Sequence, residues 1–187
     1  MIAELSSSPN RPCPDWHQAL LESGVLERLT DFDPRVAGTL PLGVSIASSD
    51  IDILCHASDP NDVGDVLWHC HDRLPLLSLR RWTSGVRPLI VNFAWGGWPV
   101  ELFVSPVPVE QQEGWCHFVA EKRLLELGGE QLRSHVMALR QAGMKTEPAF
   151  AQVLGLRGDP YAALYALADV PDDVLCSVLA SVGFTAS

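Results

Sequence analysis

The sequence predicts an α+β fold in which a mixed sheet with flanking helices is followed by a C-terminal helical bundle. Three runs between residues 76 and 106 are rich in β-branched and aromatic residues, and the last two are joined by Gly96-Gly97, a strong hairpin signal. After Val109, apolar residues recur at the helical period through several segments bounded by glycine or proline.

The elements of the N-terminal half follow from local patterns. Residues 1–14 are rich in serine and proline, and we expect a loose lead-in there. A helix is predicted over 14–30, with Asp15 as its N-cap. Next come a short strand ending in a tight turn, an apolar strand, and a helix that Asn61 could cap, over residues 35–40, 50–57 and 61–75.

The later elements divide into strands and helices. The strand-like runs cover residues 76–85, 87–95 and 98–106. The helical segments cover residues 113–129, 130–143, 146–156, 159–169 and 171–183. In the first of these helices, Glu121 and Lys122 are predicted on the solvent-facing side. We therefore expect an α+β core over 15–108 and a helical region over 109–187 packed on it.

Composition limits the classes of function. The chain of 187 residues has a formal net charge of −10, and its lysines are Lys122 and Lys145 alone. Such a chain is unsuited to binding long nucleic acid through a basic surface, but a small phosphorylated ligand needs only a local pocket. Five cysteines without CxxC spacing favour reduced thiols. No signal-peptide pattern and no membrane-length apolar run occurs, so a cytoplasmic location is the default expectation.

Two aspartates lie in the apolar stretch "DIDIL". In a strand, Ile51 and Ile53 would enter the core, while Asp50 and Asp52 would share the opposite face with Cα atoms roughly 6.5 Å apart. Like charges at that spacing call for a cation, and oxygen ligands suit Mg²⁺ or Mn²⁺. Alternatively, the two acids simply mark a solvated face.

A third acid is expected from the hairpin. Counting outward from Gly96-Gly97 sets Asn92 opposite Glu101, a lone acid in an apolar strand. If this strand neighbours the Asp50–Asp52 strand, three carboxylates converge, as in two-metal phosphoryl-transfer sites. A single glutamate on a hairpin is otherwise usually a surface residue.

Together, Gly38-Thr39, the two aspartates and Glu101 resemble the signature of the DNA polymerase β-like nucleotidyltransferase superfamily. There, a glycine-containing turn cradles nucleotide phosphates, two strand acids bind metal, and a third acid lies on a later strand. The resemblance implies a nucleotidyltransferase-like sheet and catalytic, metal-binding roles for Asp50, Asp52 and Glu101. The chain departs from the pattern in having Thr39 where Ser or Gly is usual and Glu101 where Asp is usual.

A narrower resemblance covers residues 37–167. The segments "GTLPLGVSIASSDIDI", "CHFVAEKRLLELGG" and "GMKTEPAFAQVLGLRGDPYAAL" are similar to a family of small bacterial nucleotidyltransferase-fold proteins classed as a domain of unknown function. This resemblance supports the fold and implies no particular substrate.

The implied activity is transfer of a nucleoside monophosphate from an NTP to an unidentified hydroxyl acceptor, with Mg²⁺ or Mn²⁺ as cofactor. The set expected to bind the nucleotide is Gly38, Thr39, Ser49, Lys145 and Arg81. Arg80 is an alternative to Arg81, since the two point to opposite faces of a strand, and His117 is a further candidate cation. Lys145 could equally oppose a helix dipole.

Two other functions stay open at this point: a nucleotide-binding protein of the same fold without catalysis, and an α+β interaction module whose acids are solvated. The C-terminal helices are candidates to close over a nucleotide or to form a homodimer interface.

Overall fold

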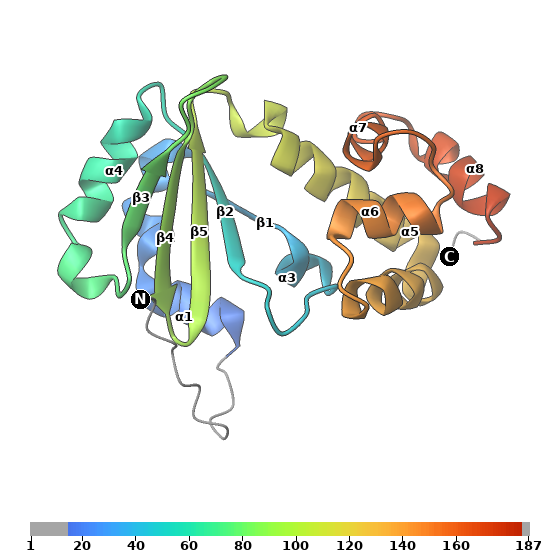
Figure 1. Ribbon diagram of the computed structural model, residues 1–187, viewed down its shortest axis with the longest axis horizontal. Helices are drawn as coiled ribbons and strands as arrows, with labels where there is room; N and C mark the ends of the chain where they lie inside the picture. The colour runs from blue at the N-terminus through green and yellow to red at the C-terminus, as the bar shows by residue number, and fades with distance from the viewer. Residues whose placement is uncertain (1–14, 185–187) are drawn as a thin grey trace.

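The computed structural model describes residues 15–184, and its centre is a five-stranded mixed sheet with the strand order β1-β2-β5-β4-β3 (Figure 1). Strand β2 pairs in parallel with β5, and the other neighbouring strands are antiparallel. The predicted α+β class and mixed sheet are confirmed. The strands are β1 Arg35–Ala37, β2 Ile51–His56, β3 Ser78–Arg81, β4 Leu89–Trp95 and β5 Trp98–Ser105.

Helices lie on both sides of the sheet (Figure 1). The N-terminal helices are α1 Trp16–Ser23, α2 Val25–Arg28, α3 Thr39–Leu42 and α4 Pro60–Trp68. The C-terminal helices are α5 Glu113–Gln141, α6 Thr146–Val153, α7 Pro160–Tyr165 and α8 Asp172–Ser181. Helices α1 and α4 lie on one side of the sheet, and α5 to α8 lie on the other (Figure 1). Single 3₁₀ turns occur at Thr30–Phe32, His71–Arg73 and Val109–Gln111. The lead-in predicted over 1–14 lies outside the described residues.

The first predicted helix is divided in two. Asp15 caps α1 as predicted, because its side chain accepts a hydrogen bond from the His17 backbone nitrogen at 3.0 Å. Gly24 then adopts φ 63°, a left-handed conformation that ends α1, and α2 follows directly. The prediction of one continuous helix over 14–30 is therefore wrong.

The N-cap of α4 differs from the prediction, whereas the break predicted between the helices over 113–129 and 130–143 is present. Asp59, and not Asn61, caps α4: its carboxylate accepts from the Asn61 backbone nitrogen at 2.9 Å, and Pro60 occupies the first turn, where proline fits. The two helices predicted over 113–129 and 130–143 are confirmed, since α5 consists of two helices joined at a kink. Its helical conformation is broken at Gly129, where φ is 62° and ψ is −158°.

The sheet separates two hydrophobic clusters. On one face, Ile51 and Ile53 pack with Val100 and Leu102 beneath helices α1, α2 and α4, as the alternation in "DIDIL" predicts. On the other face, Leu54 joins a cluster built from the C-terminal helices. Asp52 and Glu101 alternate with these buried residues, so they lie on the face toward α5.

Other predictions concern the chain as a whole. Cys55, Cys70, Cys116 and Cys176 are free thiols, and Cys13 lies outside the described residues. Within residues 15–184, no helix is both long enough and apolar enough to cross a membrane. The predicted boundary between a core over 15–108 and a helical region over 109–187 stays a prediction.

Candidate active site

Asp52 and Glu101 are neighbours across two parallel strands. The register of β2 and β5 pairs them directly, and both side chains are half-buried. Glu101 lies opposite Asn92 and Trp95 lies opposite Trp98 in the β4–β5 hairpin, as counting from Gly96-Gly97 predicts. Adjacent strands lie about 4.8 Å apart, so both carboxylates project from one small area of the sheet.

The turn after β1 is shaped around Asp52. Gly38 has φ 73° and ψ −160°, a conformation that is essentially restricted to glycine. A Cβ atom at this position would lie 1.9 Å from Oδ2 of Asp52. The missing side chain of Gly38 therefore provides the space in which the Asp52 carboxylate sits.

Thr39 and Ser49 hold the segment between that turn and β2. Thr39 Oγ1 donates to Ser49 Oγ at 3.0 Å, and Ser49 Oγ also accepts from the Ile46 backbone nitrogen at 3.0 Å. Ser49 is buried and does not line the cavity described below, whereas Gly38 and Thr39 do. Ser49 thus connects the glycine turn to the aspartate strand.

The carboxylates perturb one another. Burial raises the pKa of Asp52 to about 7, and the negative charges of Asp50, Glu101 and Glu147 act in the same direction. Burial also raises the pKa of Glu101; Asp50 adds to this shift and Arg80 opposes it. Asp50 is half-buried just before β2, so its charge reaches both partners although it does not line the cavity.

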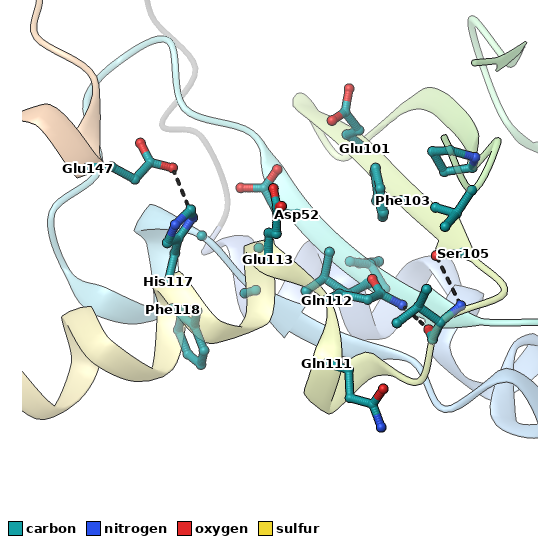
Figure 2. Close-up of a pocket in the computed structure, with 18 of the residues that line it drawn as sticks. Asp52, Glu101, Phe103, Ser105, Gln111, Gln112, Glu113, His117, Phe118 and Glu147 are labelled. Carbon is teal, nitrogen blue, oxygen red and sulfur yellow. Dashed lines mark hydrogen bonds and ion pairs between the residues drawn. The ribbon is translucent and has the colours of Figure 1, made fainter. Parts of the chain in front are cut away.

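A cavity of about 650 Å³ opens over this face of the sheet (Figure 2). One wall is the sheet, which contributes Asp52, Glu101 and Phe103. A second wall comes from the β3–β4 loop, including Trp82, whose ring meets Phe103 edge-on with centroids 6.2 Å apart. The third wall, here called the helical wall, contains Gln112, Glu113, His117, Glu121 and Glu147 from the start of α5 and from α6.

His117 and Glu147 face one another on the helical wall (Figure 2). His117 Nε2 lies 3.0 Å from the Tyr161 carbonyl oxygen, and a carbonyl can only accept, so Nε2 carries the hydrogen. His117 Nδ1 lies 3.9 Å from Glu147 Oε1. This contact joins α5 to α6 within the helical wall.

Glu121 is buried, so its predicted place on the solvent-facing side of the helix is wrong. Its side chain is 4% exposed, and Oε1 has no hydrogen-bond partner. Burial raises the pKa of Glu121 well above its ordinary range, Glu147 adds to the shift, and Arg140 opposes it. The signal in the sequence was available: Glu121 falls four residues after His117 and three after Phe118, on the face of α5 that lines the cavity.

The basic residues predicted to bind phosphate, Lys145 and Arg81 or Arg80, lie outside the lining of the cavity. Lys145 is exposed at the start of α6, beside the cavity-lining Thr146. Arg81 donates to Asn61 Oδ1 at 2.6 Å and to the Arg87 carbonyl at 3.2 Å, and it does not line the cavity. Arg80 is the member of the arginine pair whose charge acts on Glu101.

The acidic residues of the site offer donor atoms for a divalent metal ion. Asp50, Asp52 and Glu101 offer oxygen atoms alone, which is the donor chemistry that Mg²⁺ and Mn²⁺ prefer. Among residues 15–184, however, no group of three or more His, Cys, Asp and Glu side chains is already arranged to hold an ion. The donors fit a divalent ion, while a complete ligand set is not assembled.

Comparison with known proteins identifies a family that matches most of the chain and solved structures with a similar fold. The family described as "Domain of unknown function (DUF4269)" matches residues 18–167. None of the curated proteins matches the chain.

Solved structures resemble the chain at low sequence identity. The polymerase core of TRAMP, an RNA surveillance complex, matches with a TM-score of 0.54 and 16% identity, over 84% of this chain and 58% of that one. The Cid1 poly(U) polymerase H336N mutant bound to MgATP matches with a TM-score of 0.52 and 10% identity, over 79% of this chain and 46% of that one. The present chain therefore spans about half the length of these structures, and the likeness concerns the fold alone.

Proposed function

The chain belongs to the DUF4269 family and has a nucleotidyltransferase-like fold, and from this premise we propose that it transfers a nucleoside monophosphate from an NTP to a hydroxyl acceptor with the help of a divalent metal ion. The observation that carries the proposal is the direct pairing of Asp52 with Glu101 beside the Gly38 turn. Asp52, Glu101 and Gly38 line the same cavity. A metal ion bound by the two acids could hold the phosphates of a substrate there.

Asp50, Asp52 and Glu101 are the residues that would hold the metal ion. Burial, together with the neighbouring negative charges, raises the pKa of Asp52 to about 7, and a bound cation would stabilise the ionised carboxylate against both effects. A bound divalent ion would supply positive charge that neutralises phosphate oxygens and lowers the pKa of the acceptor hydroxyl.

The remaining chemistry falls to residues of the chain. The acceptor oxygen forms a bond to the α-phosphorus, the bond from that phosphorus to the bridging oxygen breaks, and pyrophosphate leaves. In our proposal, a carboxylate oxygen of Glu101 takes the hydroxyl proton, because Glu101 lines the cavity directly beside Asp52.

The Gly38-Thr39 turn is the proposed phosphate contact. Both residues line the cavity, so a ligand bound there would lie against the backbone of the turn. Lys145, exposed at the rim next to Thr146, is the proposed additional cation. Nucleotide contacts by Arg81 and Ser49 stay predictions, and we leave both residues out of the proposed site because Arg81 donates to Asn61 and Ser49 accepts from Thr39.

Isothermal titration calorimetry tests the proposal. The wild-type chain is titrated with each common NTP in the presence and absence of Mg²⁺, beside Asp52→Asn and the control Asp65→Asn, an exposed aspartate on α4. We expect Mg²⁺-dependent binding that Asp52→Asn abolishes and Asp65→Asn retains. Equal binding by all three proteins, or no metal-dependent binding, would refute it.

A non-catalytic nucleotide-binding protein is the second candidate function. It is favoured by the finding that, in the part of the chain that the structure describes, no group of three side chains is arranged as a metal site. Release of pyrophosphate from NTPs in the presence of small hydroxyl compounds separates the two candidates. Metal-dependent binding without pyrophosphate release for any compound would favour the second.

A further inference from the structure

Two buried oxygen atoms on the helical wall lack hydrogen-bond partners. They are Oε1 of Gln112 and Oε1 of Glu121, and they are the two buried side-chain polar atoms without a partner among residues 15–184. The amide nitrogen of Gln112 donates to the carbonyls of Cys55 and Val107, both at 2.9 Å, which fixes the oxygen as the free end. Buried acceptors are nearly always paired, so donors are missing from this wall.

The charge of the cavity is one-sided. Its lining residues include the carboxylates of Asp52, Glu101, Glu113, Glu121 and Glu147, but no lysine or arginine of the described chain. The positive charge of Arg140 opposes the effect of burial on the pKa of Glu121, but Arg140 does not line the cavity. Its guanidinium donates to the carbonyls of Val44 and Met144. Within the cavity, only His117 can carry a positive charge, and it already faces Glu147.

The two free oxygen atoms, on Gln112 and Glu121, lie far apart along α5. Nine residues from Gln112 to Glu121 correspond to roughly 13 Å of helix. One small donor group cannot reach both oxygens. A ligand that satisfies both must therefore present hydrogen-bond donors at two separate points.

On these grounds we propose that the helical wall binds the protonated amines of a small polyamine-type acceptor, which makes the acceptor of the proposed transferase a hydroxyl-bearing molecule with two or more amino groups. The identification of this ligand as the acceptor rests on the proposed function; the amine binding itself does not. An ammonium group has three donors and no acceptor, so it matches both the free oxygens and the negative charge of this wall. A nucleic-acid acceptor would instead bring phosphates toward five carboxylates.

Binding of spermidine, used as a linear triamine probe, tests the inference without nucleotide or metal. Calorimetry at physiological ionic strength compares the wild type with Glu121→Gln and with Glu126→Gln, an exposed residue on the same helix paired with Lys122 at 3.9 Å. Glu126→Gln removes an exposed negative charge, so a general attraction to an acidic protein would weaken in this variant at least as much as in Glu121→Gln. We expect at least about tenfold weaker binding for Glu121→Gln alone.

A neutral probe and a second variant complete the experiment. 1,8-Octanediol, a neutral chain of matching length, is expected not to bind. Glu147→Gln provides an independent variant if Glu121→Gln does not fold, and it is expected to weaken spermidine binding at least threefold. Absence of spermidine binding, equal losses in the cavity variants and Glu126→Gln, or tighter binding of a short RNA than of spermidine would overturn the inference.

The outcome is separable from that of the proposed function. If Mg²⁺-dependent NTP binding is absent but spermidine binds through Glu121, the transferase proposal fails and the amine site stands. If NTP binding depends on Asp52 but spermidine does not bind, the amine site fails and the transferase proposal stands.

Discussion

The Asp52 carboxylate fills the space that a side chain at position 38 would need: a Cβ atom on Gly38 would lie 1.9 Å from Oδ2 of Asp52. The conformation of the turn before α3 and the position of the Asp52 side chain on β2 therefore depend on each other. The position of the Asp52 carboxylate depends on the absence of a side chain thirteen residues before the start of β2.

Replacing Gly38 by alanine is therefore expected to lower both stability and nucleotide binding. The φ of 73° disfavours any side chain, and Cβ would displace the Asp52 carboxylate. We expect a loss of at least about 2 kcal/mol in the free energy of unfolding, measured by urea denaturation. Gly24→Ala is the matched control, because Gly24 has φ 63° but a Cβ there would meet nothing within 4 Å. Equal losses in the two variants would contradict the steric argument.

Asp52→Asn is expected to have opposite effects on stability without and with metal. In chelator at pH 8, removing a charge that repels Asp50 and Glu101 is expected to raise the melting temperature by a few degrees. With Mn²⁺ added, the wild type is expected to gain stability, and the variant is expected to gain much less. Differential scanning fluorimetry measures both effects, with Asp65→Asn as control. A wild type that does not respond to Mn²⁺ would count against a metal site.

Ser49→Ala is expected to act on the fold and hardly at all on nucleotide binding. The substitution removes the oxygen that accepts from Thr39 Oγ1 and from the Ile46 backbone nitrogen. A loss of about 1–2 kcal/mol in the free energy of unfolding is expected. The dissociation constant for Mg²⁺-NTP, measured below the melting transition, is expected to change less than about threefold. A tenfold weaker affinity with unchanged stability would instead make Ser49 a nucleotide contact.

Local patterns predicted most of the fold. The alternation around Asp52 and the Gly96-Gly97 turn predicted the faces of β2 and the pairing of Asn92 with Glu101, both of which the structure confirms. The resemblance to a nucleotidyltransferase-fold family of unknown function is confirmed by the family match. These predictions succeeded because strand alternation and hairpin register depend on neighbouring residues only.

The helical wall was not predicted, because it depends on contacts between distant segments. His117 meets Glu147 across thirty residues of chain, and Gln112 reaches the Cys55 carbonyl from another element. The sequence predicts both Glu121 and Lys122 on the solvent-facing side of the helix, whereas the packing of α6 against α5 buries Glu121 and leaves Lys122 exposed. Helical periodicity places Glu121 on one face with His117 and Phe118, and tertiary packing decides that this face lines the cavity.

The burial of Glu121 predicts a pH dependence of stability. The raised pKa means that the folded chain keeps the Glu121 proton above pH 4.5, the ordinary pKa, while the unfolded chain releases it. The folded state then binds more protons than the unfolded state, so stability falls as the pH rises from about 4.5 toward the raised pKa. Glu121→Gln has no such proton to lose, and its advantage in unfolding free energy over the wild type is expected to grow by at least about 1 kcal/mol across this range.

Urea denaturation at a series of pH values measures this difference, with Glu126→Gln as the control. Glu126 is exposed and paired with Lys122, so its replacement is expected to give a profile parallel to that of the wild type. Glu147 and Arg140 also act on Glu121, and both are retained in each variant, so they contribute equally to the comparison. If the stability of Glu121→Gln varied with pH in parallel with that of the wild type, Glu121 would be solvated in the folded protein. Its Oε1 would then not be an unpaired buried acceptor on the helical wall.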